Sequence, residues 1–172
     1  MRKHGLSCVA FSAHLDLGLS ASVESFKRRM EFAKRLGARF VNTFTTIRRK
    51  ERQFFINMEK LLKHAESVDM LICLENSSDG SDALFNVAAD AVTLLQRLNS
   101  GHVGINYDTG NIISHRPELD PVADALSAIP HCTYMHLKDL HRTPDGWFFT
   151  QVGSGDLDAQ RVLETVSRYT LP

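Results

Sequence analysis

Residues 103–111 read Val-Gly-Ile-Asn-Tyr-Asp-Thr-Gly-Asn, a short β-rich run that ends in a carboxylate and a turn. The chain contains four further runs of this kind, each of them followed by a polar residue. Together the five runs predict strands at Leu6–Phe11, Arg39–Phe44, Met70–Leu74, Val103–Tyr107 and Cys132–Leu137. Each run is short and rich in apolar and β-branched residues, as a strand requires.

The segments between these runs repeat their apolar residues with the 3.6-residue period of an α-helix. They predict helices over 22–36, about 54–65 and 84–98, a helix opening at Asp120-Pro121, and one starting near 156–158. Gly37 is a stop for the first helix, and Asp120 followed by proline is an N-cap signal. Strands that alternate with helices imply right-handed βαβ units and a parallel sheet.

The polar residues that follow the strands are spaced almost evenly along the chain. They are His14, Thr45, Glu75, Asp108 and His136, at steps of 31, 30, 33 and 28 residues. This period fits a (β/α)₈ barrel, although a doubly wound sheet could also produce it. A dinucleotide-binding sheet would show a glycine-rich loop after its first strand, and this chain has none there. We therefore predict one α/β domain over 1–172, a partial (β/α)₈ barrel of about five parallel βα units whose strand ends face one mouth.

The number of strands is smaller than a closed barrel requires. Such a barrel has eight strands and typically about 200 residues or more. The period places the next strand just after Pro172. We therefore interpret the chain as an internal section of a barrel, either truncated or completed by another chain. The open sheet edges invite pairing, so we expect a homo-oligomer.

Composition excludes several classes of protein. Lysine plus arginine equals aspartate plus glutamate, at 20 each, so the chain has no overall attraction to nucleic acid or to an anionic membrane. No stretch approaches the roughly 18 apolar residues of a membrane span. The three cysteines lack the spacing of a metal site, and a reducing, cytoplasmic location is the expectation.

Glu75, Asp108 and His136 are the candidate metal ligands. Taken singly, each has an ordinary interpretation: a solvated glutamate at the start of a loop, an aspartate in a capping turn, and a histidine in the core. Together they end successive strands one period apart. A mixed set of oxygen and nitrogen ligands suits one divalent ion, Mn²⁺, Mg²⁺, Co²⁺ or Zn²⁺.

Four strings in the chain resemble the xylose-isomerase-like barrel superfamily, which includes sugar-phosphate isomerases and epimerases, ketose 3-epimerases and inosose dehydratases. The strings are Leu-Glu-Asn (74–76), Tyr-Asp-Thr-Gly-Asn (107–111), His-Leu-Lys-Asp (136–139) and Val-Gly-Ser-Gly-Asp-Leu-Asp (152–158). The resemblance implies that the five strands correspond to barrel strands three to seven. It also implies a metal site of Glu, Asp, His and Glu on strands five to eight. Three of these carry over to Glu75, Asp108 and His136, and the fourth has no counterpart.

The resemblance further implies a reaction on a small sugar or sugar phosphate. Enzymes of this family remove and return a proton next to a carbonyl while the metal stabilises the enediolate. Two glutamates on opposite sides of the substrate carbon share this work. Glu75 is the one that this chain retains, as the candidate catalytic residue, so we expect the chain alone to be a poor catalyst or none.

Five further residues are predicted to contact substrate: His14, Asn76, Asn111, Lys138 and Asp139. The family often has a histidine where this chain has Asn111. Lys138 could neutralise a substrate oxyanion or phosphate, or could form a salt bridge with Asp139 or another neighbour. A Gly-Glu-Gly string common in the family is Gly-Ser-Gly here, at 153–155.

Three functional interpretations stay open at this point. A sugar isomerase or epimerase is favoured. A non-catalytic barrel remnant or binding module, completed by another chain, is the second. An apurinic-site endonuclease is disfavoured, because its three-metal cluster needs the histidine replaced by Asn111 and because the neutral charge offers no surface for DNA.

Overall fold

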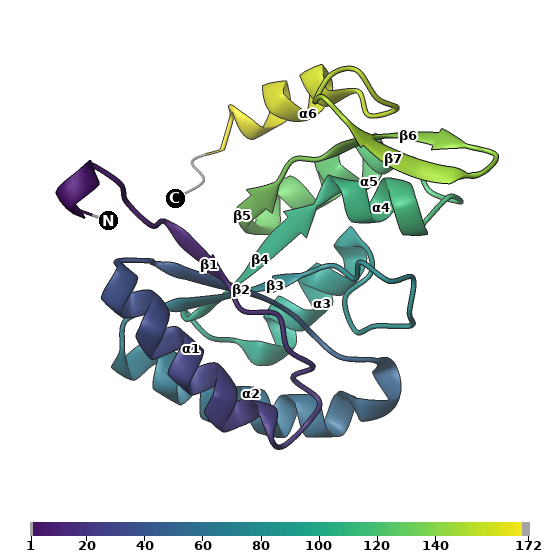
Figure 1. Cartoon of the computed structure of the whole chain (residues 1–172). Coiled ribbons are helices and arrows are strands. Elements are labelled where there is room, and N and C mark those ends of the chain that lie inside the picture. The colour runs from purple at the N-terminus through teal and green to yellow at the C-terminus, as the bar shows by residue number, and fades with distance from the viewer. Residues whose placement is uncertain (1, 170–172) are drawn as a thin grey trace.

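Five parallel strands form a curved sheet in which chain order is also spatial order (Figure 1). The strands are β1 (Ala10–Ser12), β2 (Phe40–Phe44), β3 (Leu71–Glu75), β4 (Val103–Asp108) and β5 (Cys132–His136). The structure is a computed structural model that describes residues 2–169. Consecutive parallel strands with helical crossovers make half of a (β/α) barrel, which confirms the predicted fold class.

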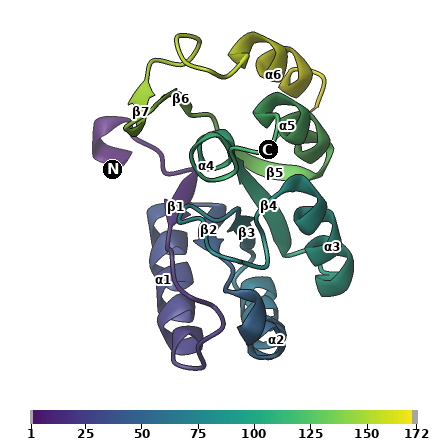
Figure 2. The same cartoon turned by 90° about the vertical axis from the view of Figure 1, so that its right-hand side faces the viewer.

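Helices follow one another around the outside of the sheet (Figure 2). They are α1 (Ser22–Leu36), α2 (Glu51–Ser67), α3 (Ala88–Leu98), α4 (Thr109–His115), α5 (Pro121–Ala128) and α6 (Ala159–Val166). Short 3₁₀ helices lie at Arg2–His4, Arg48–Lys50 and Ile129–His131. Within residues 2–169 no helix combines the length and the apolar character needed to cross a membrane.

The two faces of the sheet differ in chemistry because side chains alternate along each strand. The outer face packs against the helices through apolar residues of both, including Val41, Ile72, Leu74, Ile105, Phe26, Met30, Phe54, Met58 and Leu61. Full burial of one such side chain stabilises the fold by about 1.5–3 kcal/mol. The register places Asn42, Glu75 and Asn106 on the concave face instead. Packing therefore depends on the outer face, and the inner face is free to carry polar groups.

Two predicted elements differ from the structure at their beginnings. The first strand was predicted from Leu6 but begins at Ala10, and Leu6 and Val9 are exposed. The third helix was predicted from Leu84 but begins at Ala88, because Leu84 donates its backbone N–H to the Thr46 carbonyl at 2.8 Å. An apolar stripe alone does not distinguish such a loop from a helix.

Two elements went unpredicted. Helix α4 begins directly after Asp108, whose carboxylate accepts the N–H groups of Gly110 and Asn111 as an N-cap. The stretch 141–155, where no helix or strand is predicted, contains much of an antiparallel hairpin formed by β6 (Asp139–Thr143) and β7 (Gly146–Thr150). Gly146, at φ 129°, allows the tight turn between the two strands.

The contact between β4 and β5 gives a test of this fold. A Cβ added at Gly104 would lie 2.6 Å from Cβ of Thr133, so Gly104→Ala must displace one of the strands. We expect a loss of about 1–3 kcal/mol in the free energy of unfolding, measured by urea denaturation with circular dichroism. Gly101→Ala is the matched control, because a Cβ there meets nothing within 4 Å. Equal stability of the two variants would contradict the close β4–β5 packing.

Candidate metal centre

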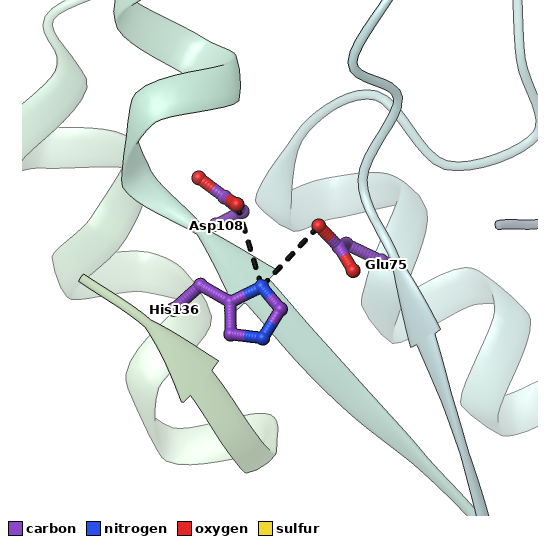
Figure 3. A group of neighbouring side chains, drawn as sticks. All are labelled: Glu75, Asp108 and His136. Atoms are coloured by element: carbon purple, nitrogen blue, oxygen red, sulfur yellow. Dashed lines mark ion pairs between the residues drawn. The ribbon is translucent and has the colours of Figure 1, made fainter. Parts of the chain in front are cut away.

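The three side chains predicted as metal ligands meet where β3, β4 and β5 end (Figure 3). Glu75 is the last residue of β3, Asp108 of β4 and His136 of β5. The register pairs Asp108 with His136 directly and Glu75 with Asn106, so the three side chains point to the same side of the sheet. Parallel pairing of successive strands is what brings together residues that lie about thirty positions apart.

The geometry of this cluster fits a metal ion. Nδ1 of His136 lies 3.4 Å from Oε1 of Glu75 and 3.4 Å from Oδ2 of Asp108, and one ligand atom from each residue lies within 4.8 Å of the others. Glu75 is 3% exposed and Asp108 is fully buried. Oδ2 of Asp108 faces two cationic side chains, Lys138 and His136. A buried anionic oxygen in that condition is suited to a cation, and the set of two carboxylates and an imidazole is one that divalent metals use.

The ionisable groups of the cluster influence one another's pKa strongly. Ion pairs with Asp108 and Glu75 raise the pKa of His136 to about 9. Burial by itself would raise the pKa of Asp108, but His136 and Lys138 outweigh it and lower that pKa. Lys138 forms a close ion pair with Oδ2 of Asp108, so its partner is Asp108 and not Asp139. At neutral pH a proton on His136 and the Lys138 ammonium therefore balance the two buried carboxylates.

His14 and Lys138 both lie at the mouth of the half-barrel. The His14 ring stacks on Phe44 at a centroid distance of 4.2 Å, and its Nε2 lies 3.8 Å from Oε2 of Glu75. Burial lowers the pKa of His14, and the attraction of Glu75 only partly opposes this. His14, Glu75, His136 and Lys138 line one pocket, so four of the predicted site residues surround a common space.

The side chains of Asn76 and Asn111 form hydrogen bonds that support the backbone at the end of β4. Oδ1 of Asn76 accepts the N–H of Asp108 at 2.8 Å, and its Nδ2 donates to the Asp108 carbonyl at 3.0 Å. Nδ2 of Asn111 donates in turn to the carbonyl of Asn76 at 2.9 Å. Both side chains are buried. These contacts fix the backbone of Asp108, and the predicted contact of either amide with substrate stays a prediction.

Asp139 has a different set of partners from the other predicted site residues. Its buried carboxylate accepts four backbone N–H groups, those of Leu140, Gly153, Gly155 and Leu157, at 2.9–3.0 Å. The structure does not bring it into the Glu75–Asp108–His136 cluster. Its contacts hold the loop that joins β7 to α6. A Cβ at Gly155 would lie 2.5 Å from Cγ of Asp139, so glycine is needed at that position.

Sequence reasoning missed two asparagines that contact the cluster. Nδ2 of Asn106 donates to Oε2 of Glu75 at 2.8 Å and lies 3.3 Å from Nδ1 of His136. Nδ2 of Asn42 lies 3.5 Å from Nε2 of His136. Asparagine is depleted in strands, so its place inside Phe-Val-Asn-Thr-Phe and Gly-Ile-Asn-Tyr-Asp was an available signal. Hydrogen bonds of this kind, made to a metal's ligands and not to the metal, hold those ligands in the orientation that binding requires.

Comparison with known proteins gives the family of the chain. The model of the family described as "xylose isomerase-like TIM barrel" matches residues 1–171. No curated protein sequence matches the chain. The match with the family model covers nearly the whole chain, including the three strand ends of the cluster.

Several solved structures share this fold. An L-ribulose 3-epimerase superimposes with a TM-score of 0.77 at 19% identity, over 97% of this chain and 60% of that one. A xylose isomerase-like TIM barrel protein from Mycobacterium smegmatis, in complex with magnesium, gives 0.76 at 19%, over 97% and 64%. A mannonate dehydratase from Streptococcus suis gives 0.78 at 14%, over 96% and 65%. At these identities the comparison establishes the fold, and the chain spans about two thirds of the length of each structure.

Metal binding should depend steeply on pH. His136 holds a proton up to about pH 9, and a metal ion must displace that proton to bind Nδ1. We therefore expect the affinity for Mn²⁺ or Zn²⁺ to rise about tenfold per pH unit from pH 6 to pH 8, measured by metal titration. Glu75→Gln and His136→Ala should each bind far more weakly. An affinity that does not change with pH in the unaltered chain would contradict the assignment of His136 as a ligand.

Proposed function

The chain belongs to the xylose isomerase-like TIM barrel family, and from that membership and its strand-end cluster we propose a divalent-metal-dependent isomerase- or epimerase-type activity on a small sugar. The observation that carries the proposal is the convergence of Oε1 of Glu75, Oδ2 of Asp108 and Nδ1 of His136. A divalent ion held by these atoms would polarise a substrate carbonyl and stabilise the enediolate formed from it. We further propose a cytoplasmic, homo-oligomeric protein with no nucleic-acid partner.

Glu75 is the proposed base. One of its oxygens, Oε2, accepts a hydrogen bond from Asn106 and lies near His14, while Oε1 faces His136. The side chain is therefore held in one orientation at the edge of the mouth pocket. A carboxylate so fixed can remove a proton from the carbon next to a substrate carbonyl. His14 can exchange a proton with Oε2, because its lowered pKa leaves it neutral near pH 7.

Lys138 is the proposed electrostatic partner of the developing oxyanion. Its ammonium forms an ion pair with Asp108. Lys138 lines the same pocket as His14 and Glu75, so a substrate bound there would lie beside its ammonium. A cation at that position stabilises negative charge on a substrate oxygen.

Proton exchange tests the function directly. A single carboxylate can remove a proton and return one from solvent, even where the second glutamate of the family pattern is not among the described residues. We expect the Mn²⁺-loaded chain to introduce deuterium next to the carbonyl of a free ketose in D₂O, observed by ¹H NMR. Glu75→Gln should slow this exchange at least about a hundredfold. Glu59→Gln, an exposed glutamate on α2, is the matched control and should leave the rate unchanged. Equal rates for the unaltered chain and Glu75→Gln would refute the proposal.

The role of Lys138 has a separate test. Lys138→Gln removes a cation that competes with the metal for Oδ2 of Asp108, so we expect Mn²⁺ to bind several-fold more tightly. The same variant should exchange the substrate proton more slowly, because the oxyanion loses its partner. Lys63→Gln, at an exposed i,i+4 pair on α2, is the control for both measurements. Weaker metal binding by Lys138→Gln would contradict the proposed competition.

A further inference from the structure

We propose that Asn42 is a positioning residue for the candidate metal centre, whose side-chain carbonyl accepts the Nε2–H proton of His136 and so reserves Nδ1 of that ring for a metal ion. The inference rests on the proposed function, which uses Nδ1 of His136 as a ligand, and it adds the residue that selects this nitrogen. Asn42 lies in the middle of β2 and is buried, with 1% of its surface exposed.

The two ring nitrogens of His136 have different surroundings. Nδ1 faces Oε1 of Glu75 and Oδ2 of Asp108, each at 3.4 Å (Figure 3). A metal ion that binds Nδ1 between these carboxylates requires the remaining ring proton to lie on Nε2. A group that accepts this second proton favours the tautomer that can bind metal and fixes the orientation of the ring.

Asn42 is the residue that the fold places at Nε2. Its amide lies 3.5 Å from Nε2 of His136, and within residues 2–169 no other group forms a hydrogen bond with that nitrogen. The register puts Cys73 beside Asn42 and Gly104 beside Cys73, so β3 and β4 carry small residues at this level of the concave face. The side chain of Asn42 can therefore meet the ring of His136 across two intervening strands.

The amide of Asn42 is able to present its oxygen to the ring. Nδ2 is the atom that lies 3.5 Å from Nε2, and it makes no second hydrogen bond in the part of the chain that the structure describes. Oδ1 is buried, and no described residue donates a hydrogen bond to it. Rotation by about 180° around the Cβ–Cγ bond exchanges these two atoms and leaves the shape of the side chain almost unchanged. Oδ1 then accepts the Nε2–H proton and gains the donor that it lacks.

Asn106, the other asparagine that contacts His136, cannot take this role. Its Nδ2 donates to Oε2 of Glu75 at 2.8 Å, so the orientation of its amide is fixed by a buried carboxylate. The same Nδ2 lies 3.3 Å from Nδ1 of His136, on the side of the ring that faces the proposed metal. The two asparagines therefore divide the work, since Asn106 orients Glu75 and Asn42 orients His136.

Two substitutions of Asn42 separate this role from a contribution to packing. Asn42→Leu keeps the size of the side chain and removes the acceptor, so we expect the full chain to bind Zn²⁺ about 10- to 100-fold more weakly, measured by competition with a chelating dye. Asn42→Asp keeps an acceptor and should bind Zn²⁺ at least as tightly as the unaltered chain. A role in packing alone predicts the opposite order, because a buried carboxylate destabilises the fold more than leucine does.

A second buried asparagine supplies the matched control. Asn57 lies on α2 and donates to the carbonyls of Leu17 and Leu19, away from the cluster. Asn57→Leu should lower the free energy of unfolding, measured by urea denaturation, and leave the affinity for Zn²⁺ unchanged. Equal affinities for Zn²⁺ in Asn42→Leu and the unaltered chain would overturn the inference.

Nitrogen NMR tests the tautomer without any variant of Asn42. In the Zn²⁺-loaded full chain with ¹⁵N-labelled histidine, correlations from the ring protons of His136 identify the protonated nitrogen, with His136→Ala for assignment. We expect zinc on Nδ1 and a slowly exchanging proton on Nε2. Zinc on Nε2 with the proton on Nδ1 would overturn the role of Asn42 and leave the proposed activity, which proton exchange tests separately, standing. Zinc that binds without perturbing either nitrogen of His136 would overturn both.

Discussion

The burial of two carboxylates at adjoining strand ends is the constraint on which the rest of this site depends. Glu75 and Asp108 are almost inaccessible to solvent, and an uncompensated buried charge is strongly destabilising. The protein compensates in two ways. Neutral amide groups donate hydrogen bonds to both carboxylates. Asn106 donates to Glu75, and two backbone N–H groups donate to Asp108. The remainder is balanced by the proton on His136 and by Lys138. A divalent ion can replace that proton, so the same constraint makes the cluster receptive to metal.

This constraint also explains the polar residues inside the sheet. Asn42 and Asn106 occupy central strand positions, where apolar side chains would give more packing energy. The outer face supplies most of the hydrophobic core, through its contact with the helices. The concave face can then carry groups that orient Glu75 and His136. Stability and function thus use opposite faces of the same five strands, and alternation along each strand keeps them separate.

The fold and the cluster could be predicted because both follow from local pattern and regular spacing. A β-rich run ending in Glu75, Asp108 or His136 is visible in the sequence, and parallel topology brings such ends together. Asp139 shows the limit of that approach. Its four backbone partners come from 140–157, a contact set that depends on the hairpin and on a glycine at 155. Asn111 shows the same limit, because its contact with Asn76 runs between two loops. Neither set of contacts can be read from a periodic pattern in the sequence.

The balance of charge at the mouth bears on what the cluster can bind. Glu75 and Asp108 form a site that attracts a small cation, whereas Asp16 beside them is already paired with Lys50. A metal ion bound at the cluster would cancel the charge nearest to the reacting carbon, where Lys138 already helps to balance it. It would cancel less of the charge farther away, at Asp79, whose carboxylate is held by serine hydroxyls. Under the proposed function, negative charge that develops on a substrate oxygen beside Lys138 would therefore be stabilised.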